Sequence, residues 1–476
     1  MRICICAEGC YPYVAGGVSS WIQDYIKRTP QHEYVIWAIA ANQSMQGDFA
    51  YELPENVVEV KEVFLDSMLN TQRTQQKKIE LTDEQRINVY KMIACEDPDW
   101  KGIFELFDQD TGIDPIDFLL DPGFLRILKA VCEDKHPFLP FTDYFWTVRS
   151  MFLPVLYLIH NDMVEADMYH SVSCGYAGML ASAASIKYDK PFMLTEHGIY
   201  TREREEEILR ASWVAPLFKD LWIELFYMFT RCAYGTADLV SSLFSHASYA
   251  QRELGCDGKK QLVIPNGVNY ELFSGVRDKT QDGYIDVGAI VRLAPIKDIK
   301  TMIYAMQRVE EHNDHVRLHI MGSTNEDPEY YSECVALVKD LELKNVIFTG
   351  RVKTWEYLEK IDFSILSSIS EGMPLATLES MAAGRPAVTT NVGCCNELLF
   401  GVDDEFGEAG ICVPAMHPKQ LADAILLMAS DPERIKRMGE NGKKRVEKFF
   451  KHPDMVRKYL EAYEETCRRH FDKGNE

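Results

Sequence analysis

What the sequence lacks argues against several classes of protein. The 476-residue chain has no excess of basic residues, and its formal net charge is −22. A nucleic-acid-binding protein normally presents a basic face, so this class is disfavoured. An anionic ligand would have to be held by a few isolated Arg or Lys side chains, because the overall field of the protein repels it.

Signatures of metal and nucleotide binding are also missing. The 13 cysteines are irregularly spaced and form no paired CxxC pattern, so we expect free thiols in a reducing cytoplasm and no metal site. The sequence contains neither a P-loop GxxxxGK[ST] nor a GxGxxG fingerprint.

No segment has the character of a signal peptide or a membrane span. Residues 1–7 are predicted to form a strand, and the most apolar stretches, 151–159 and 221–230, are shorter than the roughly 20 residues that span a bilayer. We therefore expect a cytoplasmic chain that does not cross a membrane, although it can dock on a membrane protein.

Short apolar runs with strand character alternate with helical patterns, which predicts an α/β fold with parallel sheets. Strands are predicted at 2–7, 34–40, 167–170, 191–195, 238–242, 261–264, 284–291, 316–321, 345–349, 363–366 and 387–390. Residues from about 66 to 160 interrupt this rhythm and are interpreted as a helical insertion.

The chain is too long for a single hydrophobic core, so two doubly wound domains are expected. Pro265-Asn266-Gly267 is a turn signal, and the polar residues 275–283 have the composition of a linker. The predicted domains are residues 1–275, which include the insertion, and 276–450, followed by a terminal helix at 451–476. Because ligands of such domains bind beyond the C-terminal ends of the strands, the loops that follow strands are the candidate site.

The most informative segment, residues 370–379, follows a predicted strand and opens a predicted helix at 374–383. Pro374 suits the first turn of a helix, and the N–H groups after it form a natural anion site. Two carboxylates next to an anion site are expected if they accept hydrogen bonds from sugar hydroxyl groups. Glu371 would then bind a donor hexose, and Glu379 would bind a ribose. Alternatively, Glu371 is a helix cap and Glu379 a solvated side chain. The predicted donor-binding residues here are Glu371, Gly372, Met373, Pro374, Leu375, Ala376 and Glu379.

Two cations follow the first strand of the second domain. Arg292 offers a planar fork for phosphate oxygens and Lys297 a point charge, across a turn that contains Pro295. Together they can neutralise a leaving diphosphate without magnesium. The alternative is a pair of surface charges at the end of a strand.

Weaker signals lie in other loops. Gly16 and Gly17 can let backbone N–H groups approach a phosphate, and His197, at the end of a strand, can hydrogen-bond the hexose. Gly322 and Val352 follow strand ends where a base can stack. Each of these also fits an ordinary turn or helix cap.

In their order along the chain, these segments resemble the family-four retaining glycosyltransferases of the GT-B fold. Residues 371–379 resemble the Glu-x7-Glu motif of that family, Arg292 and Lys297 match its diphosphate-binding pair, and Pro265–Val268 resembles its inter-domain signature. Later loops at 384–386, 393–398 and 410–414 are also similar. The resemblance covers almost the whole chain except the insertion, and it implies that the first domain binds the acceptor and that the terminal helix crosses back onto it.

Residues 7–21 and 195–204, together with the insertion, look like the cytosolic glycosyltransferases of Pel-type exopolysaccharide assembly (the PelF group). This resemblance implies a UDP-hexose donor such as UDP-glucose or a UDP-N-acetylhexosamine, a polysaccharide acceptor, no cofactor or metal, and a membrane-embedded export partner. It implies retention by front-face attack, with His197, Arg292, Lys297 and Glu371 as the catalytic residues. Gly372-Met373-Pro374 departs from the centre of the motif in many relatives, so the sequence leaves the hexose open.

Two other functions remain open at this stage. A UDP-sugar epimerase of the same fold would need an acid and a base beside one sugar carbon, and it would release no free UDP. A subunit that only senses nucleotide sugars would need no catalytic groups, yet Arg292, Lys297 and Glu371 are all present.

Overall fold

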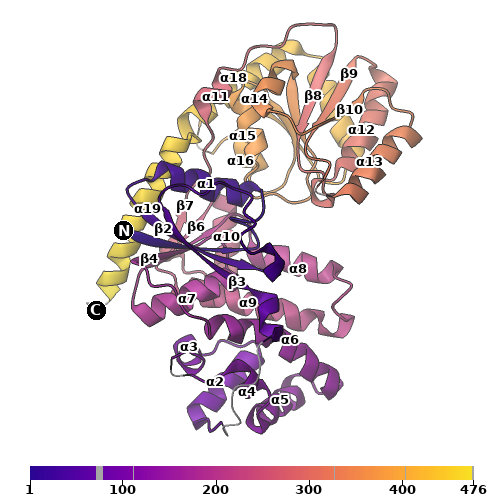
Figure 1. Cartoon of the computed structure of the whole chain (residues 1–476). Coiled ribbons are helices and arrows are strands. Elements are labelled where there is room, and N and C mark those ends of the chain that lie inside the picture. Colours follow the sequence, from indigo (N-terminus) through magenta and orange to yellow (C-terminus); the bar gives the residue numbers. More distant parts are fainter. Residues whose placement is uncertain (71–78, 111, 326, 403, 474–476) are drawn as a thin grey trace. The chain divides into compact units, whose positions relative to one another are not determined.

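The computed structural model describes residues 1–70, 79–110, 112–325, 327–402 and 404–473. The chain forms two compact units (Figure 1). The first comprises Met1–Val263 and Tyr459–Glu476, and the second comprises Ile264–Lys458.

The described part of the first unit contains a parallel sheet with the strand order β3-β2-β1-β4-β5-β6-β7. Its strands are β1 (Arg2–Glu8), β2 (Glu33–Ala40), β3 (Val57–Phe64), β4 (Met168–Ser171), β5 (Phe192–Glu196), β6 (Leu239–Ser242) and β7 (Gln261–Val263). Ile3 pairs with Tyr34 on one side and with Met168 on the other. Most of β1, β2 and β4–β6 is buried, as expected for parallel strands covered by helices on both faces.

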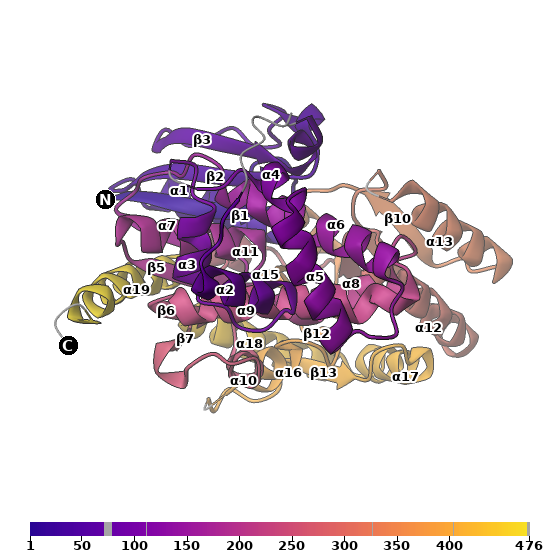
Figure 2. The same cartoon turned by 90° about the horizontal axis from the view of Figure 1, so that it is seen from below.

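Helices cover this sheet and form the predicted insertion. The covering helices are α1 (Gly17–Arg28), α7 (Tyr176–Tyr188), α8 (Tyr200–Arg210), α9 (Lys219–Thr236) and α10 (Ser245–Glu253). The insertion contains α2 (Asp83–Ile93), α3 (Trp100–Leu106), α4 (Pro115–Leu119), α5 (Pro122–Lys135) and α6 (Phe141–Ile159). Its helices α2–α5 lie beyond α7 and α9 on one side of the sheet (Figures 1 and 2). The prediction of a helical insertion is confirmed, and its residues 71–78 and 111 lie outside the described part.

Local sequence explains why the insertion is helical. Side chains of Thr82, Asp99, Asp114 and Asp121 each accept a backbone N–H at the start of a helix, from α2 to α5 in order. The rings of Phe107, Phe118 and Phe124 pack edge to face at the centre. Caps and a separate aromatic core let this segment fold on the side of the sheet without adding a strand.

The described part of the second unit contains a parallel sheet with the order β10-β9-β8-β11-β12-β13. Its strands are β8 (Ile285–Ile290), β9 (Val316–Met321), β10 (Val346–Gly350), β11 (Phe363–Leu366), β12 (Ala387–Thr390) and β13 (Gly410–Val413). Its helices are α11 (Tyr270–Ser274), α12 (Ile299–His312), α13 (Pro328–Asp340), α14 (Thr354–Tyr357), α15 (Leu375–Ala382), α16 (Cys395–Phe400), α17 (Pro418–Ala429), α18 (Pro432–Phe449) and the first residues of α19 (His452–Lys473).

In both sheets the strand order reverses beside the first strand. β1 lies between β2 and β4, and β8 lies between β9 and β11. The connections after the two strands at such a point leave in opposite directions and open a crevice beyond their C-terminal ends. The loops after β1 and β4, and those after β8 and β11, are therefore the places where ligands are expected.

The border between the units differs from the predicted one near residue 275. Residues 264–274 pack with the second unit because Val268 pairs with the segment between α18 and α19: its N–H donates to Phe450 O at 2.8 Å, and its carbonyl accepts from His452 N at 3.1 Å. The predicted terminal helix begins at His452 in the structure, and its residues from Tyr459 onward pack with the first unit.

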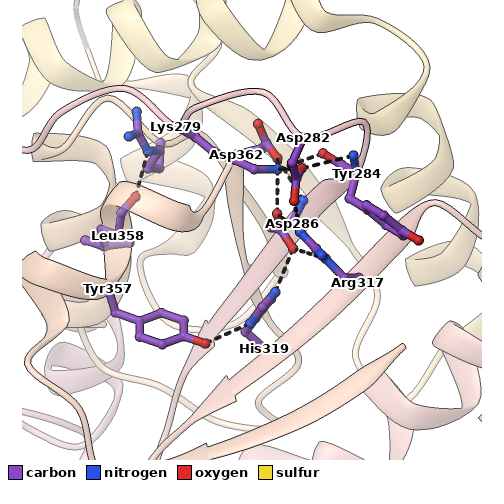
Figure 3. A network of polar contacts seen from close by, with 10 residues as sticks. Lys279, Asp282, Tyr284, Asp286, Arg317, His319, Tyr357, Leu358 and Asp362 are labelled. Atoms are coloured by element: carbon purple, nitrogen blue, oxygen red, sulfur yellow. Dashed lines mark hydrogen bonds and ion pairs between the residues drawn. The ribbon is translucent and has the colours of Figure 1, made fainter. Parts of the chain in front are cut away.

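A polar network fastens the N-terminal ends of three strands of the second sheet, opposite the expected site (Figure 3). Asp286 of β8 accepts from Arg317 and His319 of β9 at 2.6 and 2.7 Å, and Lys279 bridges Asp286 to Asp362, just before β11, at 2.5 and 2.7 Å. Burial alone would raise the pKa of Asp286, but its basic partners outweigh burial and hold this pKa well below the usual range. The network holds the strands that carry the site in fixed relation.

A second buried polar group links α19 to the first sheet. His170 of β4 is 0% exposed, and its ring nitrogens lie 2.8 Å from Tyr463 Oη and 2.8 Å from Thr195 Oγ1. Burial lowers the pKa of His170 to about 3 from its ordinary 6.5, with a smaller contribution from His197. The folded state therefore holds this imidazole neutral.

We expect the contribution of His170 to the free energy of unfolding to be constant above about pH 6.5 and to fall as the pH drops from 6.5 toward 3, because only the unfolded chain protonates this residue in that range. His170→Gln removes this dependence. The stability gap between wild type and His170→Gln should therefore narrow by about 2 kcal/mol from pH 7 to pH 5. Denaturant unfolding at both pH values measures the gap, with His312→Gln as an exposed control. A gap that stays constant would contradict a neutral, buried His170.

Candidate functional site

The loops after β8 and β11 meet at one ion pair. Lys297 Nζ donates to Glu371 Oε1 at 2.5 Å, and Ser368 Oγ donates to the same oxygen at 2.5 Å. The side chains of Lys297 and Glu371 are 17% and 10% exposed. The pair thus lies at the reversal of strand order in the second sheet, where a ligand is expected.

Further hydrogen bonds hold the two loops together around this pair. Ile369 N donates to Ile296 O at 2.9 Å, and Ser367 Oγ lies 2.9 Å from the carbonyl oxygens of both Lys297 and Asp298. The backbone around Lys297 is therefore fixed by residues of the neighbouring strand, which leaves its side chain placed before any ligand arrives.

The loop after β12, at Gly393 and Cys394, packs against the segment 371–374. Gly393 has a φ of +54°, and a Cβ at this position would overlap the carbonyl oxygens of Glu371 and Gly372. Cys394 N donates to Gly372 O at 3.1 Å. On another side, Asn266 N donates to the sulfur of Met373, which is buried, at 3.1 Å. These contacts fix the path of the chain into α15.

Helix α15 begins at Leu375, one residue later than predicted, and Pro374 is the residue before it. By helix geometry the N–H groups of Leu375 and Ala376 have no acceptor inside the helix. They therefore provide donors for an anion next to Glu371.

Glu379 lies one turn further along α15 and is partly buried. Among the described residues, no hydrogen bond or ion pair to its carboxylate is found. Burial alone raises the pKa of Glu379 to about 7. A partly buried carboxyl group without a hydrogen-bond donor in the protein can accept hydrogen bonds from a ligand.

The other predicted site residues of the second unit, Arg292, Gly322 and Val352, lie in other loops than Glu371. Arg292 follows β8 and is exposed. A Cβ at Gly322 would overlap Val291 O, and Gly322 N donates to Gly350 O at 3.1 Å, so Gly322 shapes the chain beside Arg292. Val352 is half-buried beyond β10, the edge strand, and is separated from the Lys297–Glu371 pair by β9 and β8.

Gly16, Gly17 and His197 lie in the first unit. Gly17 opens α1, and a Cβ at either glycine would meet nothing within 4 Å, so the space before them is open. Gly16 N donates to Tyr51 Oη at 3.3 Å. A small group can therefore approach the start of α1 without moving a side chain.

His197 follows β5 and packs edge to face against Trp21, with ring centroids 4.8 Å apart. Burial lowers the pKa of His197 to about 4, so the ring is neutral near pH 7, and its buried Nε2 has no hydrogen-bond partner among the described residues. Glu196 beside it is a structural residue, because its carboxylate accepts from Tyr234 Oη at 2.6 Å and Gln251 Nε2 at 2.9 Å.

Sequence reasoning missed Ser367 and Ser368, and it missed the contact between Asn266 and the predicted residue Met373. Ser367 and Ser368 follow an apolar strand directly, and this position was a signal, since polar residues at a strand's C-terminal end often serve a site. No local signal could have paired Asn266 with Met373, which are 107 residues apart. In the described part of the chain, no group of three or more His, Cys, Asp or Glu side chains is placed to hold a metal ion. Nor is any described helix both long and apolar enough to span a bilayer.

Two family models match the chain. The model described as "Domain of unknown function (DUF3492)" matches residues 1–259, which is more than half of the chain. The chain belongs to this family. The model described as "Glycosyl transferases group 1" matches residues 277–445, which include β8, β11 and the Lys297–Glu371 pair. This DUF3492 protein is therefore a glycosyltransferase.

Known relatives agree with this assignment. The MMP alpha-(1->4)-mannosyltransferase of Mycolicibacterium hassiacum is 24% identical over 368 residues, which cover 75% of this chain and 86% of the relative. An uncharacterized glycosyltransferase of Methanocaldococcus jannaschii is 26% identical over 300 residues, which cover 62% and 75%.

Solved structures identify the fold. HepE of Anabaena, solved in complex with UDP, matches with a TM-score of 0.61 at 15% identity, covering 98% of this chain and 100% of HepE. The sucrose-phosphate synthase of Thermosynechococcus elongatus matches with a TM-score of 0.60 at 16% identity, covering 98% of each chain. The DUF3492 protein has the GT-B fold of these glycosyltransferases, which confirms the predicted fold class.

The support of the 371–374 loop by Gly393 is testable through stability. Gly393→Ala should lower the free energy of unfolding of the second unit by about 2–4 kcal/mol, because backbone strain at positive φ adds to an overlap with two carbonyl groups. Gly384→Ala is a matched control, since Gly384 has a φ of +71° but open space at its Cβ. Thermal and denaturant unfolding measure both variants. Equal losses in the two variants would show that the contact with the 371–374 loop is unimportant.

Proposed function

We propose that this glycosyltransferase moves a hexose from a UDP-sugar, UDP-glucose or a UDP-N-acetylhexosamine, onto a growing Pel-like exopolysaccharide, with retention of the anomeric configuration and without a metal. The observation that carries the proposal is the Lys297–Glu371 pair at the start of α15. It puts a cation for a diphosphate and a carboxylate for sugar hydroxyls within one hydrogen bond of each other.

The chemistry assigned to these groups is the following. The bond between C1 of the hexose and the β-phosphate oxygen breaks, and negative charge grows on the departing UDP. Arg292, Lys297 and the N–H groups at the start of α15 stabilise that charge. The acceptor oxygen attacks C1 from the side that UDP leaves, and its proton passes to the departing diphosphate. Three sources of positive potential from the chain itself make a divalent cation unnecessary.

The remaining roles concern binding. Glu371 and His197 bind hydroxyl groups of the hexose, and Glu379 binds the ribose hydroxyls. Gly16 and Gly17 admit the diphosphate to the start of α1. Complexes of HepE with UDP and with UDP-glucose support a uridine nucleotide as the donor.

The resemblance of residues 7–21 and 195–204 to the PelF group carries the rest of the proposal: a polysaccharide acceptor, action at the cytoplasmic face of the membrane, and a membrane-embedded partner that exports the product. The donor-binding residues do not depend on this part of the proposal.

Calorimetry with UDP-glucose, the UDP-N-acetylhexosamines, UDP-galactose, GDP-mannose and UDP, in buffer with EDTA, tests the proposal. We expect one UDP-sugar to bind more tightly than the others. Lys297→Ala should weaken its binding about tenfold to a hundredfold, because a charge-assisted contact is lost and Glu371 is left unpaired beside an anion. Lys300→Ala is the control, since Lys300 pairs with Glu333 at the surface at 2.7 Å. Absence of nucleotide binding, or an unchanged affinity in Lys297→Ala, would refute the proposed site.

The raised pKa of Glu379 predicts that donor binding depends on pH. Its pKa of about 7 means that the carboxyl group is largely protonated below pH 7. Ribose hydroxyls donate to the charged form, so binding should release a proton and strengthen from pH 6 to pH 8, by at most about tenfold per pH unit. UDP-glucose is the suitable ligand, because its diphosphate is esterified at both ends and does not titrate in this range. Calorimetry at three pH values should give a flatter dependence for Glu379→Gln, and identical curves would contradict a role for Glu379.

A further inference from the structure

Three residues of the first unit to which the proposed donor site gives no role, Glu8, Tyr200 and Arg204, meet at the carboxylate of Glu8. Glu8 is the last residue of β1. Its Oε1 accepts a hydrogen bond from Tyr200 Oη at 3.3 Å and lies 3.8 Å from Arg204 Nη2. Its Oε2 accepts from Ala177 N, in the first turn of α7, at 3.3 Å. The N-terminal run and the start of α8 are thus joined across 192 residues of sequence.

This cluster lies beyond the C-terminal ends of strands, where ligands of such sheets bind. β1 and β4 are the neighbours between which the strand order of the first sheet reverses, and Glu8 and the start of α7 lie beyond their C-terminal ends. A Cβ at Gly175 would overlap both Tyr200 Oη and Glu8 Oε2. A glycine is needed here because the backbone before α7 approaches the cluster so closely.

Buried polar atoms without a partner lie in the same two connections. Among the described residues, Ser173 Oγ after β4, and His197 Nε2 and Thr201 Oγ1 after β5, make no hydrogen bond. Thr201 is only 1% exposed. Buried polar groups are nearly always paired in folded proteins, so the unpaired hydroxyl groups of Ser173 and Thr201, in the connections that carry Gly175 and Tyr200, indicate a ligand that forms hydrogen bonds.

The cluster is rigid and still reaches solvent. The guanidinium of Arg204 lies 5.1 Å from the centroid of the Tyr200 ring and 5.9 Å from that of Phe226, and it donates to Glu207 at 2.5 Å. The side chains of Glu8 and Arg204 are 12% and 35% exposed. A fixed carboxylate, a fixed guanidinium and aromatic rings together supply acceptors, donors and an apolar face, which a sugar ring needs.

We propose that Glu8, Tyr200 and Arg204 form the site that binds hydroxyl groups of the acceptor sugar. This inference rests on the proposed function and assigns the acceptor to particular residues of the first unit. Glu8 accepts a hydroxyl of the terminal sugar, Arg204 donates to a second oxygen, and Tyr200 holds Glu8 in place.

The test compares wild type, Glu8→Gln and Tyr200→Phe, with Glu253→Gln as the control. Glu253 pairs with Arg202 at the surface, where its side chain is 74% exposed. Donor affinity is measured by calorimetry with the UDP-sugar that wild type prefers. Acceptor affinity is measured on protein saturated with UDP, by saturation-transfer NMR with glucose, N-acetylglucosamine, N-acetylgalactosamine, maltose, cellobiose and chitobiose.

We expect at least one sugar probe to bind the wild type and the control. Glu8→Gln should weaken binding of that probe about tenfold to a hundredfold, since an accepting carboxyl oxygen is replaced by a donating amide group. Tyr200→Phe removes one hydroxyl group and keeps the ring, so it should weaken binding of the sugar probe less than Glu8→Gln does. Donor affinity should stay within about twofold of wild type, because the donor contacts lie in other residues.

Equal probe affinity in all four proteins would overturn the inference, and so would a UDP-saturated wild type that binds none of the probes. Loss of donor affinity in Tyr200→Phe at an unchanged melting temperature would assign the cluster to the donor and also overturn it. A wild type that binds no nucleotide contradicts the proposed function instead, so the two failures are distinguishable.

Discussion

The contact between Lys297 and Glu371 is the interaction on which the site of the second unit depends. It joins the two loops at which the strand order reverses, and it is mostly buried, so salt and solvent screen it less than a surface pair. Hydrogen bonds from Ser367 and Ser368 and the close packing of Gly393 all act on the backbone or side chains of this pair. At the opposite edge, the network around Asp286 fixes the strands from which both loops start. The site is therefore held from both ends of the same strands.

Charge balance explains how a chain of net charge −22 can bind a diphosphate. The four ionisable residues assigned to the donor, Arg292, Lys297, Glu371 and Glu379, sum to zero when all are charged. Burial of Glu379 raises its pKa to about 7, so near neutral pH part of this negative charge is already removed. The N-terminus of α15 adds positive potential. Local groups thus create a favourable field where the protein as a whole does not.

Much of the fold could be predicted from the sequence, because parallel strands buried on both faces are continuous apolar runs between helical patterns. The strands at Val316–Met321, Phe363–Leu366 and Ala387–Thr390 have the predicted bounds. β3 and β13 were missed: β3 alternates with Glu and Lys, and β13 is short and flanked by loops. The border near Ile264 could not be predicted, because it depends on the pairing of Val268 with Lys451, far away in the sequence. For the same reason no sequence pattern joined Lys297 to Glu371 or Glu8 to Tyr200, since such contacts follow from strand order.

The run at residues 7–21 contributes to the first unit in two different ways. Tyr11 and Tyr13 turn inward and donate to Gln23 and Glu62, each at 2.7 Å, so these tyrosines support the loop and are not available to a sugar. Glu8 before them ends a strand at the reversal of strand order. The group 1 model that matches the second unit describes many glycosyltransferases, whereas residues 1–259 match a family of their own. Most of the proposed donor groups lie in the shared part, so the proposed acceptor site is sought in the first unit, where the fold brings Glu8 and Arg204 together beyond the C-terminal ends of the strands.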